Sequence, residues 1–217
     1  NNIAMGLTSS DALLTGTDNI AIGRLSFSAS TDGADNIAIG RSALAVSGND
    51  GDNNVAIGVA ALGAGDVSGN DNIAMGTNTM DALTTGLCNV AIGRDTLGTA
   101  TTGNDNVAIG TQAMTGGVTT GIRNIAIGAG PALAITSGKD NIIMGVSAGD
   151  ALTTGCDNLA MGVNALGTSV TGCFNIAIGE LAMGVGVVTG ISNIAIGQTA
   201  MDALTTGIDN IAIGQSA

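Results

Sequence analysis

The chain is built from one short motif, an Asn followed by an aliphatic residue, Ala, then Ile or Met, and Gly. The motif occurs thirteen times, with Ile143 replacing the Ala once, and its Asn recurs every 17 or 18 residues. A fixed period of this length is typical of architectures in which each unit stacks on the next, because one unit cannot bury its apolar face alone. We therefore treat residues 1–217 as a single repeat array.

The pattern inside one unit predicts short strands separated by turns. In Ile20-Ala21-Ile22 the two Ile side chains share one face, and the Gly23 that follows permits a turn. A second apolar residue, such as Leu97, lies eight positions after the Asn in most units. The apolar clusters have the length of strands, and each recurrent Gly would cost about 1 kcal/mol in a helix. We predict that each unit forms a strand, a turn, a second strand and a second turn.

The predicted fold is all-β: a parallel β-solenoid, or β-roll, of about thirteen coils with 17–18 residues per coil. Residues at the same motif position then form rows along the stack, with a spacing of about 4.8 Å. Because the sequence begins and ends within the repeat, without polar caps, we expect a segment of a longer fibre protein or end-to-end stacking of copies.

The composition argues against several classes of function. Seventeen acidic and five scattered basic residues give a net charge of −12, whereas binding to nucleic acid needs clustered Lys and Arg. No apolar run approaches the roughly 20 residues that span a bilayer, so we expect no membrane insertion. The chain has no His to act as the usual base of a Ser or Cys nucleophile, and its acidic residues follow the repeat. We therefore expect no catalytic residues and no enzyme.

The motif, as in Asn19-Ile20-Ala21-Ile22-Gly23, resembles the repeat of trimeric autotransporter adhesin heads and repeats of phage tail fibres. The resemblance covers the whole chain, and the coil of 17–18 residues, longer than the adhesin coil, favours the phage-fibre branch. It implies a left-handed parallel β-roll that assembles as a homotrimer and binds host surfaces. It also implies that the Ile rows fill the interior of the coils. Because the chain has only two aromatic residues to stack on sugar rings, we expect a cell-surface receptor to be bound elsewhere on the full chain.

The Asn row is predicted to be an internal ladder of hydrogen bonds. Each amide can donate to one neighbouring coil, accept from the other and satisfy backbone groups in the turns. The row consists of Asn19, Asn36, Asn54, Asn72, Asn89, Asn106, Asn124, Asn141, Asn158, Asn175, Asn193 and Asn210.

The Ala of the motif points away from the two Ile residues and forms a row of small side chains. Two interpretations stay open: a tightly packed turn or narrow core, and a close interface between chains, since an exposed apolar stripe favours association. We predict self-assembly through this row, which consists of Ala21, Ala38, Ala56, Ala74, Ala91, Ala108, Ala126, Ala160, Ala177, Ala195 and Ala212.

Two further rows raise ligand hypotheses. Asp precedes the motif Asn in seven units, and adjacent carboxylates such as Asp18 and Asp35 would repel each other unless Ca²⁺ lay between them. Exposed turn residues that limit sideways aggregation are the interpretation that we favour, with no metal ligands and no cofactor. A Thr row, including Thr85 and Thr154, suggests ice binding, but neighbouring Thr residues such as Thr84 and Thr85 should point to opposite sides.

The cysteines give a test of the coil register. Cys156 and Cys173 both lie two residues before a motif Asn in consecutive coils, so their Cα atoms should be about 4.8 Å apart, within the range of a disulfide. Two alternatives stay open, a disulfide bridge and two free neighbouring thiols. Side chains of one row point in parallel, whereas a disulfide needs a dihedral angle near ±90°. Cys88 lies one residue before its Asn and should reach neither of them.

These observations predict a structural fibre or stalk segment of a virion tail fibre or a bacterial surface adhesin. We expect an extracellular location, on the virion or on the bacterial cell surface. The alternative is a flat-faced binding module that recognises a glycan or ice.

Overall fold

The structure is a computed structural model that describes residues 1–46, 51–117, 119–186 and 189–217. The chain divides into two compact units, unit 1 (Asn1–Asn106) and unit 2 (Val107–Ala217). Unit 1 contains the strands β1 (Ile3–Met5), β2 (Ile20–Ile22), β3 (Ile37–Ile39), β4 (Val55–Ile57), β5 (Ile73–Met75) and β6 (Val90–Ile92). Unit 2 contains β7 (Val107–Ile109), β8 (Ile125–Ile127), β9 (Ile142–Met144), β10 (Leu159–Met161), β11 (Ile176–Ile178), β12 (Ile194–Ile196) and β13 (Ile211–Ile213).

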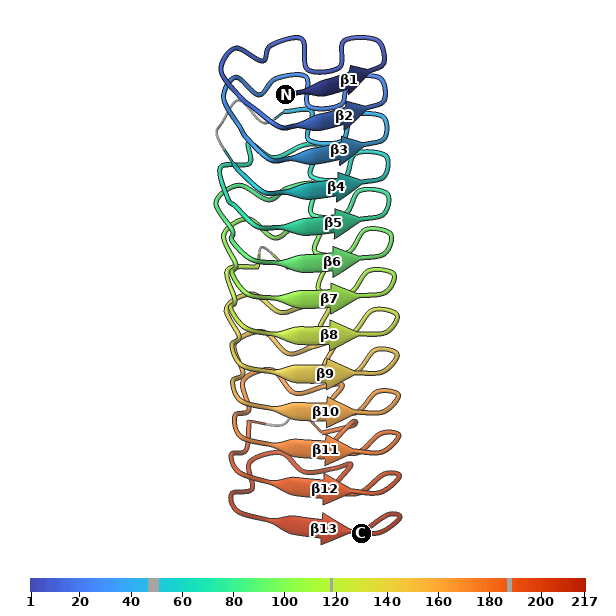
Figure 1. Cartoon of the computed structure of the whole chain (residues 1–217). Coiled ribbons are helices and arrows are strands. Elements are labelled where there is room, and N and C mark those ends of the chain that lie inside the picture. Colours follow the sequence, from blue (N-terminus) through green and yellow to red (C-terminus); the bar gives the residue numbers. More distant parts are fainter. Residues whose placement is uncertain (47–50, 118, 187–188) are drawn as a thin grey trace. The chain divides into compact units, whose positions relative to one another are not determined.

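Each unit is a parallel β-solenoid, as the repeat predicts. Within a unit, the strands follow one another in sequence order and pair in parallel with the motif in register (Figure 1). Ile20 is paired with Ile37, and Ala21 with Ala38. Each motif residue therefore lies next to the equivalent residue of the neighbouring strand, which produces continuous rows of identical or similar side chains.

The prediction of a second strand in each coil is wrong. The structure describes one three-residue strand per coil, and the apolar residue eight positions after the Asn lies in a turn. Leu62, Met80 and Leu97 have φ angles of 49°, 50° and 48°, in the left-handed region. A chain that enters this region turns instead of extending, so these side chains reach the interior from a bend.

The Gly at the end of the motif is required by close contact between coils. Gly23 has a φ of 137°, a region that side chains other than Gly resist. A Cβ atom at this position would lie 2.5 Å from the carbonyl oxygen of Gly40 in the next coil. The stacking distance thus depends on a row of residues without side chains.

The core of each coil is narrow. Its largest fully buried side chains come from the turn positions, as in Leu62, Met80 and Leu166, and from a later position, as in Leu83 and Leu152. The strand contributes only its Asn neighbour and its central residue to this interior.

Candidate assembly face

The central Ala residues of the strands point into the coils, so the predicted small-residue interface is wrong. Every residue of that row from Ala21 to Ala195 has 0% exposure, and Ala212 in the last coil is half-buried. The expectation that the Ile rows fill the interior is wrong for the same reason, since side chains alternate along a strand. The narrow core has room for a methyl group opposite the large turn residue, but not for two Ile side chains.

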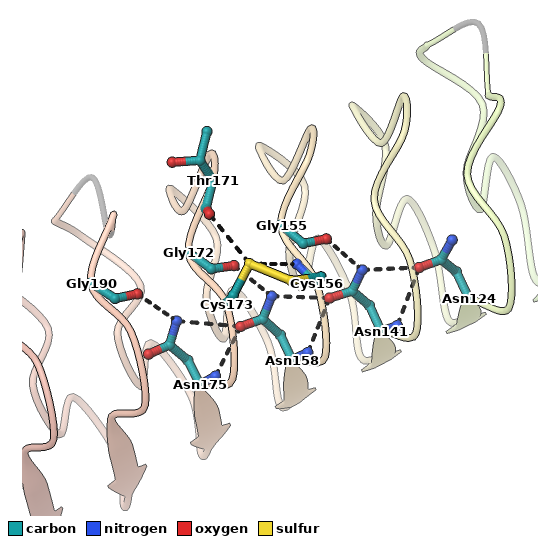
Figure 2. The surroundings of a disulfide bond; sticks show 10 residues. All are labelled: Asn124, Asn141, Gly155, Cys156, Asn158, Thr171, Gly172, Cys173, Asn175 and Gly190. Atoms are coloured by element: carbon teal, nitrogen blue, oxygen red, sulfur yellow. Dashed lines mark hydrogen bonds between the residues drawn. A yellow bond between two sulfur atoms is a disulfide. The ribbon is translucent and has the colours of Figure 1, made fainter.

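The Asn ladder fixes this orientation. Asn158 donates from Nδ2 to the carbonyl oxygen of Gly172 at the end of its own coil, at 2.7 Å (Figure 2). Its Nδ2 and its backbone N also donate to Oδ1 of Asn141, at 3.0 and 3.1 Å. Asn and Ala are two residues apart, so their side chains lie on the same face of the strand. Because the Asn amide bonds inside the coil, the Ala side chain also points inside.

The same bonds recur along both units, which confirms the predicted ladder. In unit 1, for example, Asn89 donates to Oδ1 of Asn72 and to the carbonyl oxygen of Gly103. The motif Asn side chains from Asn19 to Asn193 are at most 2% exposed. Within the described ranges, no buried side-chain nitrogen or oxygen atom lacks a hydrogen-bond partner.

One coil supports the inward position of the Ala independently. In β9, Ile143 replaces the Ala and is fully buried, and the large turn residue of that coil is replaced by Gly149. A Cβ atom on Gly149 would lie 3.0 Å from Cδ1 of Ile143. The two positions therefore share one space in the core, and this exchange was a sequence signal that could have placed the Ala row inside.

The residues on either side of the Ala form an outward aliphatic face. In internal coils these side chains are half-buried or exposed: Ile73 (37%), Met75 (39%) and Ile142 (41%) are among the exposed ones, whereas Ile39 and Ile57 are half-buried. The aliphatic face of unit 1 consists of Ile3, Met5, Ile20, Ile22, Ile37, Ile39, Val55, Ile57, Ile73, Met75, Val90 and Ile92. The aliphatic face of unit 2 consists of Val107, Ile109, Ile125, Ile127, Ile142, Met144, Leu159, Met161, Ile176, Ile178, Ile194, Ile196, Ile211 and Ile213.

These faces have the size of a functional apolar patch. A three-residue strand at a spacing of 4.8 Å covers about 48 Å², so each unit presents roughly 300 Å² of aliphatic sheet. The largest apolar patch of a typical monomer is about 300–600 Å² and is often functional. Sequence reasoning missed this face because it assigned the Ile rows to the core.

A charged or polar rim runs along each edge of the aliphatic face. We call the residue before each motif Asn the N-side rim and the residue after each motif Gly the C-side rim. On the N-side rim, Asp18, Asp35 and Asp71 have φ angles of 60°, 58° and 61°. Asp and Asn adopt this left-handed conformation more readily than other side chains do, which explains the Asp row without a metal.

The N-side rim also contains an ion pair between coils. In unit 2, Arg123 donates to both carboxylate oxygens of Asp140, at 2.6 and 2.8 Å. The Arg123 hydrogen bond holds the pKa of Asp140 below its usual range. Among the described residues, no group of three or more Asp, Glu, His or Cys side chains is arranged to hold a metal ion. The Ca²⁺ hypothesis stays a prediction.

The Thr row lies away from the aliphatic face and is used partly for internal bonding. Thr84 and Thr153 donate their hydroxyl groups to the carbonyl oxygens of Thr101 and Val170 in the next coil, at 2.9 and 3.0 Å. Thr85 and Thr154 are exposed. The exposed Thr residues thus form a single column instead of the two-column array that an ice-binding face would need.

Cys156 and Cys173 form a disulfide between neighbouring coils of unit 2, with Cα atoms 4.7 Å apart (Figure 2). The predicted spacing is confirmed, and of the two alternatives the structure has the bridge. Cys88 is free and exposed on the N-side rim of unit 1.

Comparisons of the chain with protein-family models, with curated proteins and with solved structures find no match. In the part of the chain that the structure describes, no helix is long and apolar enough to cross a membrane.

Proposed function

We propose that the chain is a structural segment of a fibre or stalk that self-assembles through its aliphatic faces. The observation that carries this proposal is the row of half-buried or exposed aliphatic side chains, two on every strand of both units. A surface of this kind loses contact with water when a second flat aliphatic surface covers it, which is favourable by about 25 cal/mol per Å².

The occupant that fits this face best is another copy of the chain. Its columns repeat at the strand spacing of about 4.8 Å, and a second copy offers columns with the same period. The face itself carries no hydrogen-bonding side chain, since its positions hold only Ile, Val, Leu and Met. A glycan would need polar partners that these columns do not supply.

The proposal extends to setting and stoichiometry. The motif resemblance supports a virion tail fibre or a bacterial surface adhesin, and a homotrimer. The disulfide between Cys156 and Cys173 supports an oxidising, extracellular location, where such bonds persist. The stacked Asn amides and the disulfide both connect one coil to the next, which is consistent with a structural segment.

The test is a pair of charges on the aliphatic face of unit 1. Ile39→Glu with Ile57→Glu should weaken self-association by at least about tenfold, because each interface would bury unpaired carboxylates. The control is Thr85→Glu with Thr102→Glu, which places the same charges on exposed positions of consecutive coils away from the face. Sedimentation velocity measures association, and circular dichroism verifies that both variants are folded. Unchanged oligomers in the Ile variant, or a monomeric wild type at high concentration, would refute the proposal.

Substitution of the inward row should have a different effect. Ala91 is fully buried, so Ala91→Glu would place a carboxylate in the core and lower the free energy of unfolding. If the Ala91→Glu variant were folded but dissociated, the Ala row would be the interface between chains after all.

A further inference from the structure

The basic residues of unit 1 occupy one edge of its aliphatic face. Residues 1–106 contain three, Arg24, Arg41 and Arg94, and each directly follows a motif Gly. All three therefore lie on the C-side rim, and all three are exposed. Arg94 is 3.2 Å from the carboxylate of Asp95. For Arg24 and Arg41, the described residues of the chain supply no ion-pair partner.

The opposite edge of the same face is acidic. The N-side rim of unit 1 includes Asp18, Asp35, Asp71 and Asp105, all exposed. Asp18 and Arg24 flank β2, and Asp35 and Arg41 flank β3, so both charges occur at the same level of the stack. The aliphatic face of unit 1 thus has only acidic charged side chains on one edge and only basic ones on the other, with uncharged residues such as Val59 and Asn53 between them.

This arrangement distinguishes the two ways in which copies can pack face to face. If the symmetry axis is parallel to the stacking direction, the N-side rim of one copy meets the C-side rim of the next, and Asp meets Arg. If the copies are antiparallel, each rim meets its own equivalent, so Asp meets Asp and Arg meets Arg. Like charges at an interface are unfavourable and suppress the wrong arrangement.

We propose that the opposed rims of unit 1 select a parallel arrangement of copies, in which Arg24 and Arg41 pair with Asp18 and Asp35 of a neighbouring copy. This proposal rests on self-assembly through the aliphatic face, and adds the polarity and the pairing residues. The rims of unit 2 carry no such division, because its C-side positions hold no basic residue and its N-side rim carries Arg123, which pairs with Asp140. In unit 1, Asp18 is also 2.8 Å from the N-terminal ammonium group of Asn1. The selecting charges belong to unit 1.

Charge reversal tests the pairing. In Arg24→Glu with Arg41→Glu both rims are acidic, and in Asp18→Arg with Asp35→Arg both are basic. Both residue types already occur in these rows, since Glu180 lies on the C-side rim and Arg123 on the N-side rim. Each variant alone should associate about tenfold more weakly than the wild type at low salt, and the equimolar mixture should associate more strongly than either variant alone.

A control and a salt series complete this experiment. Asp11→Arg with Asp32→Arg makes the same change of net charge at exposed positions off the rims and should leave association unchanged. The differences should shrink at about 0.5 M NaCl, because salt screens exposed pairs. A mixture that associates no better than the single variants would overturn the pairing.

Crosslinking tests the polarity. In a Cys88→Ser background, Asp18→Cys and Arg24→Cys variants are mixed and treated with a short bismaleimide reagent. The parallel arrangement predicts a crosslinked species that joins one copy of each variant and little crosslinking of either variant alone. Oligomers that sediment normally without this mixed product would overturn the inference and leave self-assembly intact. A wild-type protein that stays monomeric would instead refute the proposed self-assembly on which this inference rests.

Discussion

The exchange of volume between Ile143 and Gly149 provides a quantitative test of the inward strand face. Ile143 is fully buried, so Ile143→Ala should destabilise the protein by about 2–5 kcal/mol through lost burial and the cavity that remains. Gly149→Leu should also destabilise, because its Cβ atom alone would lie 3.0 Å from Cδ1 of Ile143. Overpacking of this kind costs about 1–3 kcal/mol.

The double variant should recover much of this loss. Ile143→Ala with Gly149→Leu recreates the pair found in the next coil, where Ala160 and Leu166 are both fully buried. Leu166 has a φ of 54°, and Gly149 already has the same angle, so the backbone there suits the new side chain. Its left-handed conformation costs about 1–2 kcal/mol relative to Gly. The double variant should therefore be within about 2 kcal/mol of the wild type, with a favourable coupling of at least about 2 kcal/mol.

Urea unfolding followed by far-ultraviolet circular dichroism measures these differences, since the chain has no Trp or Tyr for fluorescence. The matched control is Ala160→Ile with Leu166 retained, which should be overpacked and less stable. If the effects of the substitutions at 143 and 149 on the free energy of unfolding were simply additive, the two side chains would not share one space in the core. The inward position of the Ala row would then lose its independent support.

Three further predictions concern the ladder, the turns and the half-buried carboxylate of Asp150. Asn89→Ala should cost about 3 kcal/mol or more in urea unfolding, because it removes the acceptor of Asn106 and the donor to Gly103. Phe174→Asn should raise the melting temperature, since exposed Phe174 has a φ of 58°, whereas Phe27→Asn, at φ 50° but fully buried, should lower it. Burial raises the pKa of Asp150, so its charged form opposes folding at neutral pH. Asp150→Asn should therefore raise the melting temperature at pH 7, and this gain should vanish as the pH falls through the raised pKa to below about 3.8; an equal gain at pH 3 and pH 7 would exclude the carboxylate as the cause.

Much of the fold could be predicted because the period alone determines the stacking. The intervals of 17 or 18 residues place Asn72 next to Asn89 and Cys156 next to Cys173, and both relations are found in the structure. The Asn ladder was predictable as well, since stacked amides can donate to one neighbour, accept from the other and bond to backbone groups of the turns.

The orientation of the strand was not predictable from alternation alone. Period two separates Ala from its two Ile neighbours but does not say which side is the core. Hydrophobicity favoured Ile inside, whereas the width of the coil allows only Ala opposite Leu or Met. The prediction of a second strand was wrong for a related reason. Leu97 and its equivalents adopt the left-handed conformation, which such side chains rarely do, so the residue types at these positions did not indicate a turn.

The central claim is that Ala faces inward and that the aliphatic columns face outward and cover each other on assembly. Solvent paramagnetic relaxation of Ala β and Ile δ1 methyl groups, measured in dilute and concentrated samples, tests both parts in one measurement. We expect the motif Ala methyl groups, such as that of Ala108, to be protected at every concentration. The Ile methyl groups of the face, such as that of Ile92, should be accessible when dilute and protected when concentrated. Accessible Ala methyl groups, or Ile methyl groups that stay accessible in the assembled state, would contradict the account.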